Sequence, residues 1–317
     1  MQINSVKKVL VIMLFLTAAF PFKALSKYQD SIERTFMVHE GGTLDIKSDI
    51  GSISVTSGTK ETVEVRINRE VDTNNKDLAE EILENLEISM EKQRDDVYIE
   101  IDYKNKDWNF FSLFSNKRNN LRLKIEVTIP EKYNVDLKTS GGSITVEDLD
   151  GYANCRTSGG SIELESVNGP VNANTSGGRI RLASAYGDAY LRSSGGGITT
   201  ENISGSVNAH TSGGGIEIGE VAGNIDATTS GGSITAHLSN QITENCRLTS
   251  SGGSIYLYIN PECRFSINAQ TSGGGVKTDF PVTLTGELEK NRLNADINGG
   301  GPEIYLRTSG GGINLRN

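Results

Sequence analysis

The sequence repeats itself every eighteen residues along much of its second half, and this repeat limits the fold more than any other feature. The fixed part reads Thr-Ser-Gly-Gly or a close variant, and an apolar residue follows it. Its serine stands at positions 140, 158, 176, 194, 212 and 230, then at 251 and 272, and finally at 309, with a shorter variant at 298–301. Repetition at a fixed period of this length is typical of a stacked architecture in which each copy contacts its neighbours.

Alignment of the copies shows apolar residues alternating with polar ones on both sides of the glycines. One apolar column holds Ile144, Ile162, Ile180, Ile198, Ile216, Ile234, Ile255 and Val276. A second column, after a single recurring glycine, holds smaller residues such as Ala153, Val171 and Ala189. The period of two predicts strands with one buried face, because a helix would show a period of 3.6.

Each copy therefore predicts two or three short strands joined by tight turns at Ser-Gly-Gly and at the single glycine. We expect the glycines to supply positive φ, and the threonine before each serine to point inward and to bond locally to the backbone. Copies stacked about 4.8 Å apart would bury the apolar columns in one core and pair through parallel ladders. The prediction is an all-β solenoid with consecutive copies lying on one another.

Residues 27–138 differ from the repeats, which occupy 139–317, and are expected to form the N-terminal part of the same solenoid. Strands are predicted at 36–38, 42–46, 50–55, 62–67, 97–103 and 121–129. The stretch 77–86 predicts one short amphipathic helix with Leu78, Ile82 and Leu86 on one face. We expect these strands, the helix and the loop after them to cap the stack, because an open rung would recruit other chains.

Residues 1–26 have the pattern of a secretory signal peptide. Lys7 and Lys8 precede an apolar run from 9 to 20, and Ala24-Leu25-Ser26 offers a cleavage site. About twelve apolar residues are too few for the ~20 that cross a bilayer, although an uncleaved anchor is the alternative. Loss of Lys7, Lys8 and Lys23, with no acid among residues 1–26, changes the net charge from −9 to −12. This balance argues against a nucleic-acid partner and favours an exported protein of the periplasm, cell surface or extracellular space.

Three stretches carry a family resemblance: GGTLDIKSDIGSISV at 41–55, VTIPEKYNVDLKTSGGSI at 127–144 and DINGGGPEIYLRTSGGGI at 296–313. Together with the repeated rungs they resemble the bacterial exported β-strand-repeat domain labelled "putative adhesin", over nearly all of residues 36–317. The resemblance implies a right-handed β-helix-like solenoid at or outside the cell envelope. It brings no catalytic residues, because the shared motif is made of turn and core residues.

An aromatic cluster at Trp108, Phe110, Phe111 and Phe114 is one candidate binding site. It contains the only tryptophan and three of the nine phenylalanines, flanked by lysine and arginine. One interpretation folds this loop back onto the end of the solenoid. The other makes it an exposed tip that docks a partner or a membrane interface.

An outward row of polar residues is the second candidate. Alignment places Arg156, Asn174, Arg192, His210 and Thr228 at one position of successive copies. A rigid sheet would present such a row to an envelope or extracellular protein or to a glycan. Arg156, Arg192 and His210 are the residues we expect to contribute most to binding.

Other chemistries have weaker sequence support, and neither a metal nor a cofactor is expected. An apolar residue follows the glycines where calcium-binding β-roll repeats need an aspartate. The acids are scattered among columns, whereas a glycan hydrolase needs paired carboxylates. Cys155 and Cys246 are expected in rungs too far apart to bridge, and a disulfide between Cys246 and Cys263 stays an alternative to free thiols.

The favoured function is therefore a non-enzymatic, adhesin-like binding or scaffolding protein. Two alternatives stay open from the sequence. One is a polysaccharide-processing enzyme on a β-helix scaffold, which a grouping of carboxylates on one face would support. The other is an accessory protein in envelope-stress signalling that contacts a membrane partner through Trp108–Phe114.

Overall fold

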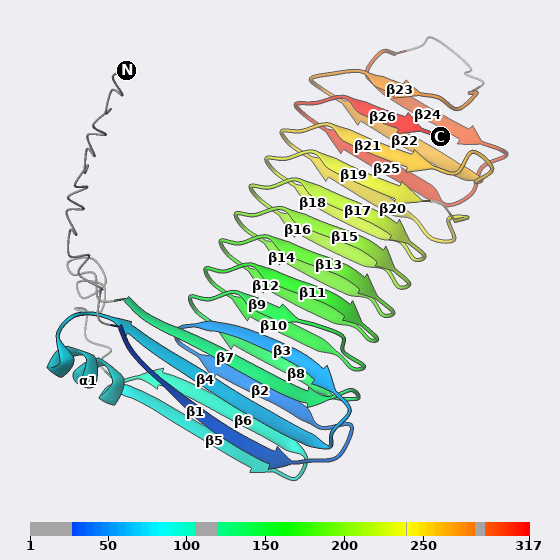
Figure 1. The fold of residues 1–317 in the computed structure, drawn as a ribbon. Helices are drawn as coiled ribbons and strands as arrows, with labels where there is room; N and C mark the ends of the chain where they lie inside the picture. Colours follow the sequence, from blue (N-terminus) through cyan, green and yellow to red (C-terminus); the bar gives the residue numbers. More distant parts are fainter. Residues whose placement is uncertain (1–26, 105–119, 239, 283–288) are drawn as a thin grey trace, which may run out of the picture.

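The structure is a computed structural model that describes residues 27–104, 120–238, 240–282 and 289–317. Within them the chain forms two long sheets of thirteen strands each, which face one another along a rod (Figure 1). In spatial order, sheet A contains β1 (Lys27–Met37), β4 (Thr62–Asp72), β7 (Asn120–Pro130), β3 (Ser52–Gly58), β9 (Ile144–Val146), β11 (Ile162–Val167), β13 (Ile180–Ala185), β15 (Ile198–Ile203), β17 (Ile216–Val221), β19 (Ile234–Leu238), β21 (Ile255–Ile259), β26 (Ile313–Arg316) and β23 (Val276–Thr278).

Sheet B supplies the second strand of each rung. From the N-terminal end of the rod it contains β5 (Leu86–Gln93), β6 (Asp96–Tyr103), β2 (Thr43–Ser48), β8 (Asn134–Thr139), β10 (Ala153–Thr157), β12 (Val171–Thr175), β14 (Ala189–Ser193), β16 (Val207–Thr211), β18 (Ile225–Thr229), β20 (Cys246–Ser250), β25 (Glu303–Thr308), β22 (Phe265–Thr271) and β24 (Arg292–Ile297). The predicted all-β solenoid is confirmed, with two strands in each copy. Because β8 contains Lys138 and Thr139 and pairs with both β2 and β10, the sheets run without a break across the boundary drawn at 138/139.

The core lies between the two sheets and consists of the predicted apolar columns. The isoleucine column pairs in register along sheet A, with Ile162 beside Ile144 and Ile180, and all three are at most 1% exposed. The smaller residues face them from sheet B, where Ala173 pairs with Cys155 and Leu191. Burial of these faces supplies the hydrophobic driving force, and the parallel ladders satisfy the backbone groups.

The threonine column forms a hydroxyl ladder that ties each rung to the one before it. Thr157 Oγ1 donates to the carbonyl oxygen of Gly142 at 2.7 Å, and Thr175 Oγ1 donates to that of Gly160 at 2.8 Å. Each hydroxyl also accepts locally, as from the N–H of Gly160 to Thr157 at 3.3 Å. The predicted local bond is therefore present, and the inter-rung bond is an addition. Ser193 and Ser250 replace threonine in this ladder and keep both bonds.

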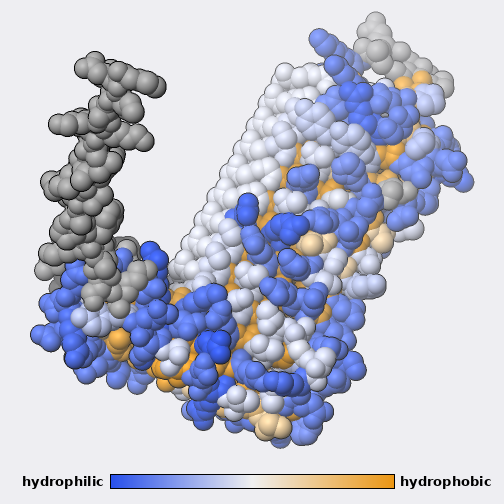
Figure 2. All heavy atoms as spheres, viewed as in Figure 1, coloured by the Kyte–Doolittle hydropathy of each residue, from blue (hydrophilic) through white to orange (hydrophobic). Residues whose placement is uncertain are grey.

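The expectation that the turn glycines supply positive φ is wrong for the Ser-Gly-Gly turns. Among the described glycines, positive φ occurs at Gly41, Gly51, Gly299 and Gly300. Sterics between rungs explain the repeated pair, because a Cβ at Gly178 would lie 2.1 Å from the carbonyl oxygen of the previous rung. Figure 2 shows the edge formed by these turns as a pale stripe, where serine, threonine and glycine gather.

The final repeat does not lie at the end of the rod, contrary to the expectation that consecutive copies stack in order. Strand β25 pairs with β20 on one side and β22 on the other, and β26 lies between β21 and β23 (Figure 1). The Asn298 variant is also no rung turn. It joins the antiparallel strand β24 to β25, and there Asn298, Gly299 and Gly300 all have positive φ.

Antiparallel strands close the N-terminal end. In sheet A, β4 pairs antiparallel with both β1 and β7, and in sheet B β5 pairs antiparallel with β6. The helix α1 (Lys76–Glu84) crosses from β4 to β5 and begins at the N-cap Asn75. It ends two residues before the predicted limit, because Leu86 starts β5 and is buried there opposite Tyr103.

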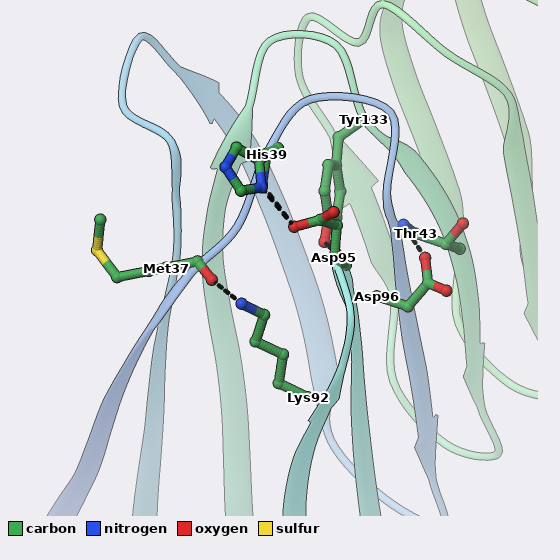
Figure 3. Close-up of polar contacts among 7 residues, drawn as sticks. All are labelled: Met37, His39, Thr43, Lys92, Asp95, Asp96 and Tyr133. Atoms are coloured by element: carbon green, nitrogen blue, oxygen red, sulfur yellow. Dashed lines mark hydrogen bonds and ion pairs between the residues drawn. The ribbon is translucent and has the colours of Figure 1, made fainter.

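A polar clasp at this end holds the turn between β5 and β6 to the connection between β1 and β2 and to the start of β2 (Figure 3). The Asp95 carboxylate accepts from the backbone N–H of His39 at 2.9 Å and lies 3.0 Å from its Nδ1, while Asp96 accepts from the N–H of Thr43 at 2.8 Å. Both hydrogen bonds from His39 lower the pKa of Asp95, the backbone bond most. The buried Tyr133 donates to the carbonyl oxygen of Asp95, and burial raises the pKa of its phenol.

Candidate ligand-binding surface

The outer face of sheet B carries two neighbouring rows of polar side chains. Parallel register from β10 to β18 places in the first row Arg156, Asn174, Arg192, His210 and Thr228. The same register places in the second row, two residues earlier in each strand, Asn154, Asn172, Tyr190, Asn208 and Asp226. The rows exist because alternate residues of a strand point to the same face and each rung repeats the spacing of the last.

A hollow of about 360 Å³ lies over these rows. Its polar lining residues are Asn172, Asn174, Tyr190, Arg192, Asn208, His210, Asp226 and Thr228. Tyr190 is the large aromatic residue in the lining, and 55% of its surface is exposed. The hollow therefore combines an accessible ring with amide, guanidinium, imidazole and carboxylate groups.

The arginines of the first row are available to a ligand. Within the described parts of the chain, no ion pair or side-chain hydrogen bond engages Arg156 or Arg192, and both side chains are exposed. Arg156 pairs in register with Asn174 and so stands beside the hollow, whereas Arg192 and His210 line it. Asp226 is the one acid of the lining, in a chain whose net charge is −9.

The other sequence-predicted candidates are not part of this surface. Trp108, Phe110, Phe111 and Phe114 lie outside the described residues. The second row was missed as a binding surface, because the sequence analysis assigned binding to a single outward row. It contains Asn172, Tyr190, Asn208 and Asp226, of which only Asp226 was noted, as one of the scattered outward acids. The signal was present, because the same eighteen-residue alignment brings these residues to one position two places upstream.

A second hollow, also about 360 Å³, lies on the outer face of sheet A near the N-terminal end and contains several glutamates. Glu33 pairs with Arg66 at 2.7 Å. A hydrogen bond from Lys60 lowers the pKa of Glu64, and one from Lys124 lowers the pKa of Glu126. Carboxylates held ionised in this way do not offer the raised pKa that a general acid of glycoside hydrolysis needs.

The cysteines are three separate buried thiols. The alternative of a Cys246–Cys263 disulfide is wrong, because all three thiols are free. Strand β25 separates β20, which begins at Cys246, from β22. Burial raises the pKa of the Cys155 thiol and of the other two. No group of histidine, cysteine and acidic residues in the described part of the chain is arranged to hold a metal ion.

Two facing sheets, a hydroxyl ladder and polar outer rows define an all-β solenoid of the repeat type. The sequence model of the Toastrack DUF4097 family matches residues 42–316, and the chain belongs to this family. A comparison with curated proteins found no match. Within the described residues, the one helix is too short and too polar to cross a membrane.

A comparison with solved structures found bacterial proteins of low similarity to this chain. A "putative adhesin" from Bacteroides fragilis is 16% identical, with a TM-score of 0.40 over 90% of this chain and 97% of that one. A "putative lipid binding protein" from Parabacteroides distasonis is 12% identical, with a TM-score of 0.41 over 91% and 97%. These similarities are too low to carry a ligand or a function over to this chain.

Proposed function

We propose that the protein is a non-enzymatic binding protein of the cell envelope or its exterior, and that it holds a glycan on the outer face of sheet B. The hollow over Asn172, Tyr190, Arg192, Asn208 and Asp226 is the observation that carries this proposal. The secretory pattern of residues 1–26 supports the location.

The chemistry of the lining suits sugars. The side-chain amides of Asn172 and Asn208 each offer one hydrogen-bond acceptor and two donors, and the Asp226 carboxylate offers acceptors only. Together these groups can bond to sugar hydroxyls, which both donate and accept. The exposed ring of Tyr190 provides a flat apolar surface against which the C–H face of a pyranose can pack. A protein partner would be expected to need several large apolar anchors, whereas the lining of the hollow contains one tyrosine.

Among the described residues that line the hollow on sheet B there is no matched acid and base, which supports a binding role over hydrolysis. The hollow on sheet B contains Asp226 as its single carboxylate, whereas glycoside hydrolysis uses two on either side of the scissile bond. The glutamates on sheet A form a grouping of the kind that would favour an enzyme. Each of them, however, has its own basic partner, and hydrogen bonds from lysine lower the pKa of Glu64 and of Glu126.

The test is binding of the mature protein to an array of bacterial envelope and host glycans, followed by titration of the best ligand. Tyr190→Ala should weaken binding by about tenfold or more, because the ring and its packing are lost. Tyr186→Ala is the matched control, since Tyr186 is 73% exposed on the turn before β14 and does not line the hollow. The proposal would be refuted if Tyr190→Ala and Tyr186→Ala bound the glycan with equal affinity, or if the wild-type protein bound no glycan on the array.

A further inference from the structure

We infer that the glycan is a linear acidic polysaccharide lying along the rod axis, with a carboxylate on every second sugar. This inference rests on the proposed function and specifies its ligand. It is carried by the charge and the spacing of the first outer row of sheet B.

The row carries three permanent positive charges over five successive strands of an acidic protein. From β8 to β16 it reads Lys138, Arg156, Asn174, Arg192 and His210, each in register with the next. Within the described residues, neither Arg156 nor Arg192 has an ion-pair partner. Two exposed guanidinium groups are therefore free to form bidentate bonds to carboxylates.

The two arginines are separated by one strand. Arg156 is on β10 and Arg192 on β14, with Asn174 of β12 between them. At a strand spacing of about 4.8 Å, the arginines repeat at about 9.6 Å along the axis. An extended β-linked disaccharide covers nearly the same length. A polymer with one acidic sugar per disaccharide would thus bring each carboxylate to an arginine and each neutral sugar to Asn174 or His210.

The second row completes this arrangement. Over β12 to β16, Asn172, Tyr190 and Asn208 lie beside the first row, so that the sugar rings can contact the tyrosine while their hydroxyls reach the amides. On β8 and β10 the second row holds Asp136 and Asn154. Because the rungs repeat at nearly the length of one sugar, successive sugars meet equivalent positions. The five strands from β8 to β16 would hold about five sugars.

The surface changes character at the end of the hollow that contains Asp226, and this change limits the length of the bound segment. Asp226 follows Asn208 in the second row and places a negative charge at that end. Farther along, the guanidinium groups of Arg247 and Arg307 both lie 4.4 Å from the ring centre of Tyr305 and are engaged there. Carboxylates would therefore be bound on the side of the row that contains Arg156 and Arg192.

A nucleic acid fits this row less well. Each strand of a DNA duplex carries one phosphate per ~3.4 Å, which is nearly three phosphates for each arginine of the row. The chain's net charge of −9 would also repel so dense a polyanion. The spacing favours a sparsely charged polymer.

The experiment is a calorimetric titration of the full mature chain with four probes of known charge spacing. The probes are a hyaluronan hexasaccharide with a carboxylate on alternate sugars, a galacturonate hexamer with one on every sugar, neutral cellohexaose, and a thymidylate dodecamer. We expect the alternating hexasaccharide to bind at least about tenfold more tightly than cellohexaose, and the galacturonate hexamer to bind no more tightly despite its doubled charge.

Charge-removing variants test the residues. Arg156→Gln and Arg192→Gln should each weaken binding of the alternating hexasaccharide by about tenfold, because each removes one charge-assisted contact. Arg181→Gln is the matched control, since Arg181 lies on sheet A and pairs with Glu201. Raising the salt concentration should weaken binding of the acidic probe and leave that of the neutral probe unchanged.

Several outcomes would overturn the inference. Equal affinity for neutral and acidic hexasaccharides, unchanged affinity in both arginine variants, or tighter binding of thymidylate would each do so. A neutral hexasaccharide that binds at least as tightly as the acidic one, with its binding lost in Tyr190→Ala, would refute the acidic ligand and leave the glycan-binding function intact. Failure of all probes together with failure on the glycan array would refute both.

Discussion

The same substitution, threonine to valine, should have opposite effects on stability at two inward positions of neighbouring rungs. Thr175 and Thr200 are 1% and 2% exposed. The Thr175 hydroxyl donates to the carbonyl oxygen of Gly160 at 2.8 Å and accepts from the N–H of Gly178 at 3.2 Å. The hydroxyl of Thr200 lies in the apolar column between Leu182 and Ile218 and has no hydrogen-bond partner.

The expected magnitudes follow from these contacts. Thr175→Val leaves two backbone groups without their partner, at about 1–3 kcal/mol each when fully buried. Because Gly160 and Gly178 are half-buried, water replaces part of the loss, and we expect a destabilisation of about 2–3 kcal/mol. Thr200→Val removes a buried, unpaired hydroxyl that costs about 1–3 kcal/mol, so we expect a stabilisation of about 1 kcal/mol or more.

Guanidinium unfolding gives the free energies, and hydrogen exchange at the Gly178 amide reports the local rung. The second measurement is needed because solenoid rungs can open without global unfolding. Thr175→Ser is the control that keeps the hydroxyl, as Ser193 does one rung away. It should lower the free energy of unfolding by much less than Thr175→Val does. If both valine variants shift stability in the same direction, hydrogen-bond satisfaction does not decide the ladder's composition.

Three further predictions test the turns, the clasp and the thiols. Gly142→Ala should strongly lower the melting temperature of the protein, because the new Cβ would lie 1.9 Å from the Gly51 carbonyl oxygen. Gly141→Ala is the control and should be nearly neutral, because no atom lies within 4 Å of its Cβ. Similar melting temperatures for the two variants would contradict the steric explanation. The pKa of Asp95 is lowered in the folded state, so its contribution to stability is present above the unfolded pKa of about 3.9 and is lost as pH falls through the folded value. The Asp95→Asn variant should therefore be less stable than wild type at neutral pH, and the stabilities of the two proteins should converge in acid unfolding scans. A difference in stability that persists below pH ~3 would argue against the clasp. Burial raises the pKa of Cys155 and of the other two thiols, so a thiol reagent should label native protein far more slowly than unfolded protein, and rapid native labelling would contradict the packing.

The columns of the rod could be predicted from the sequence because each rung must match its neighbours. Alternation placed Ile162 inward and aligned it with Ile144 and Ile180, and the eighteen-residue period fixed the register. The reason for the glycines could not be predicted in the same way. A glycine fits both a positive φ and a close backbone approach, and only the distance between rungs shows that the second applies at Gly178.

The order of the last rungs was also beyond the sequence, for a physical reason. Every rung presents nearly the same inward face, with Ile255, Val276 and Ile313 in one column, so each could pack against any other. Stacking order then depends on the connections and on what covers the end. The antiparallel strand β24 pairs with the outer edge of β22. It therefore covers the rung at 265–278, which lies at the end of the rod in place of the final repeat.

The candidate surface shows the same division between what a repeat fixes and what it leaves free. The row through Arg156, Arg192 and His210 was predictable because the period sets it, whereas the hollow depends on the sizes and shapes of the side chains in both rows. Inward positions of a solenoid are constrained by the rungs above and below, so substitutions there are limited to residues that stack. Outward positions carry no such constraint, and it is there that a ring such as Tyr190 can be placed without disturbing the ladder. A rod of this kind can therefore change its ligand by changing its outer rows while its core and its turns stay the same.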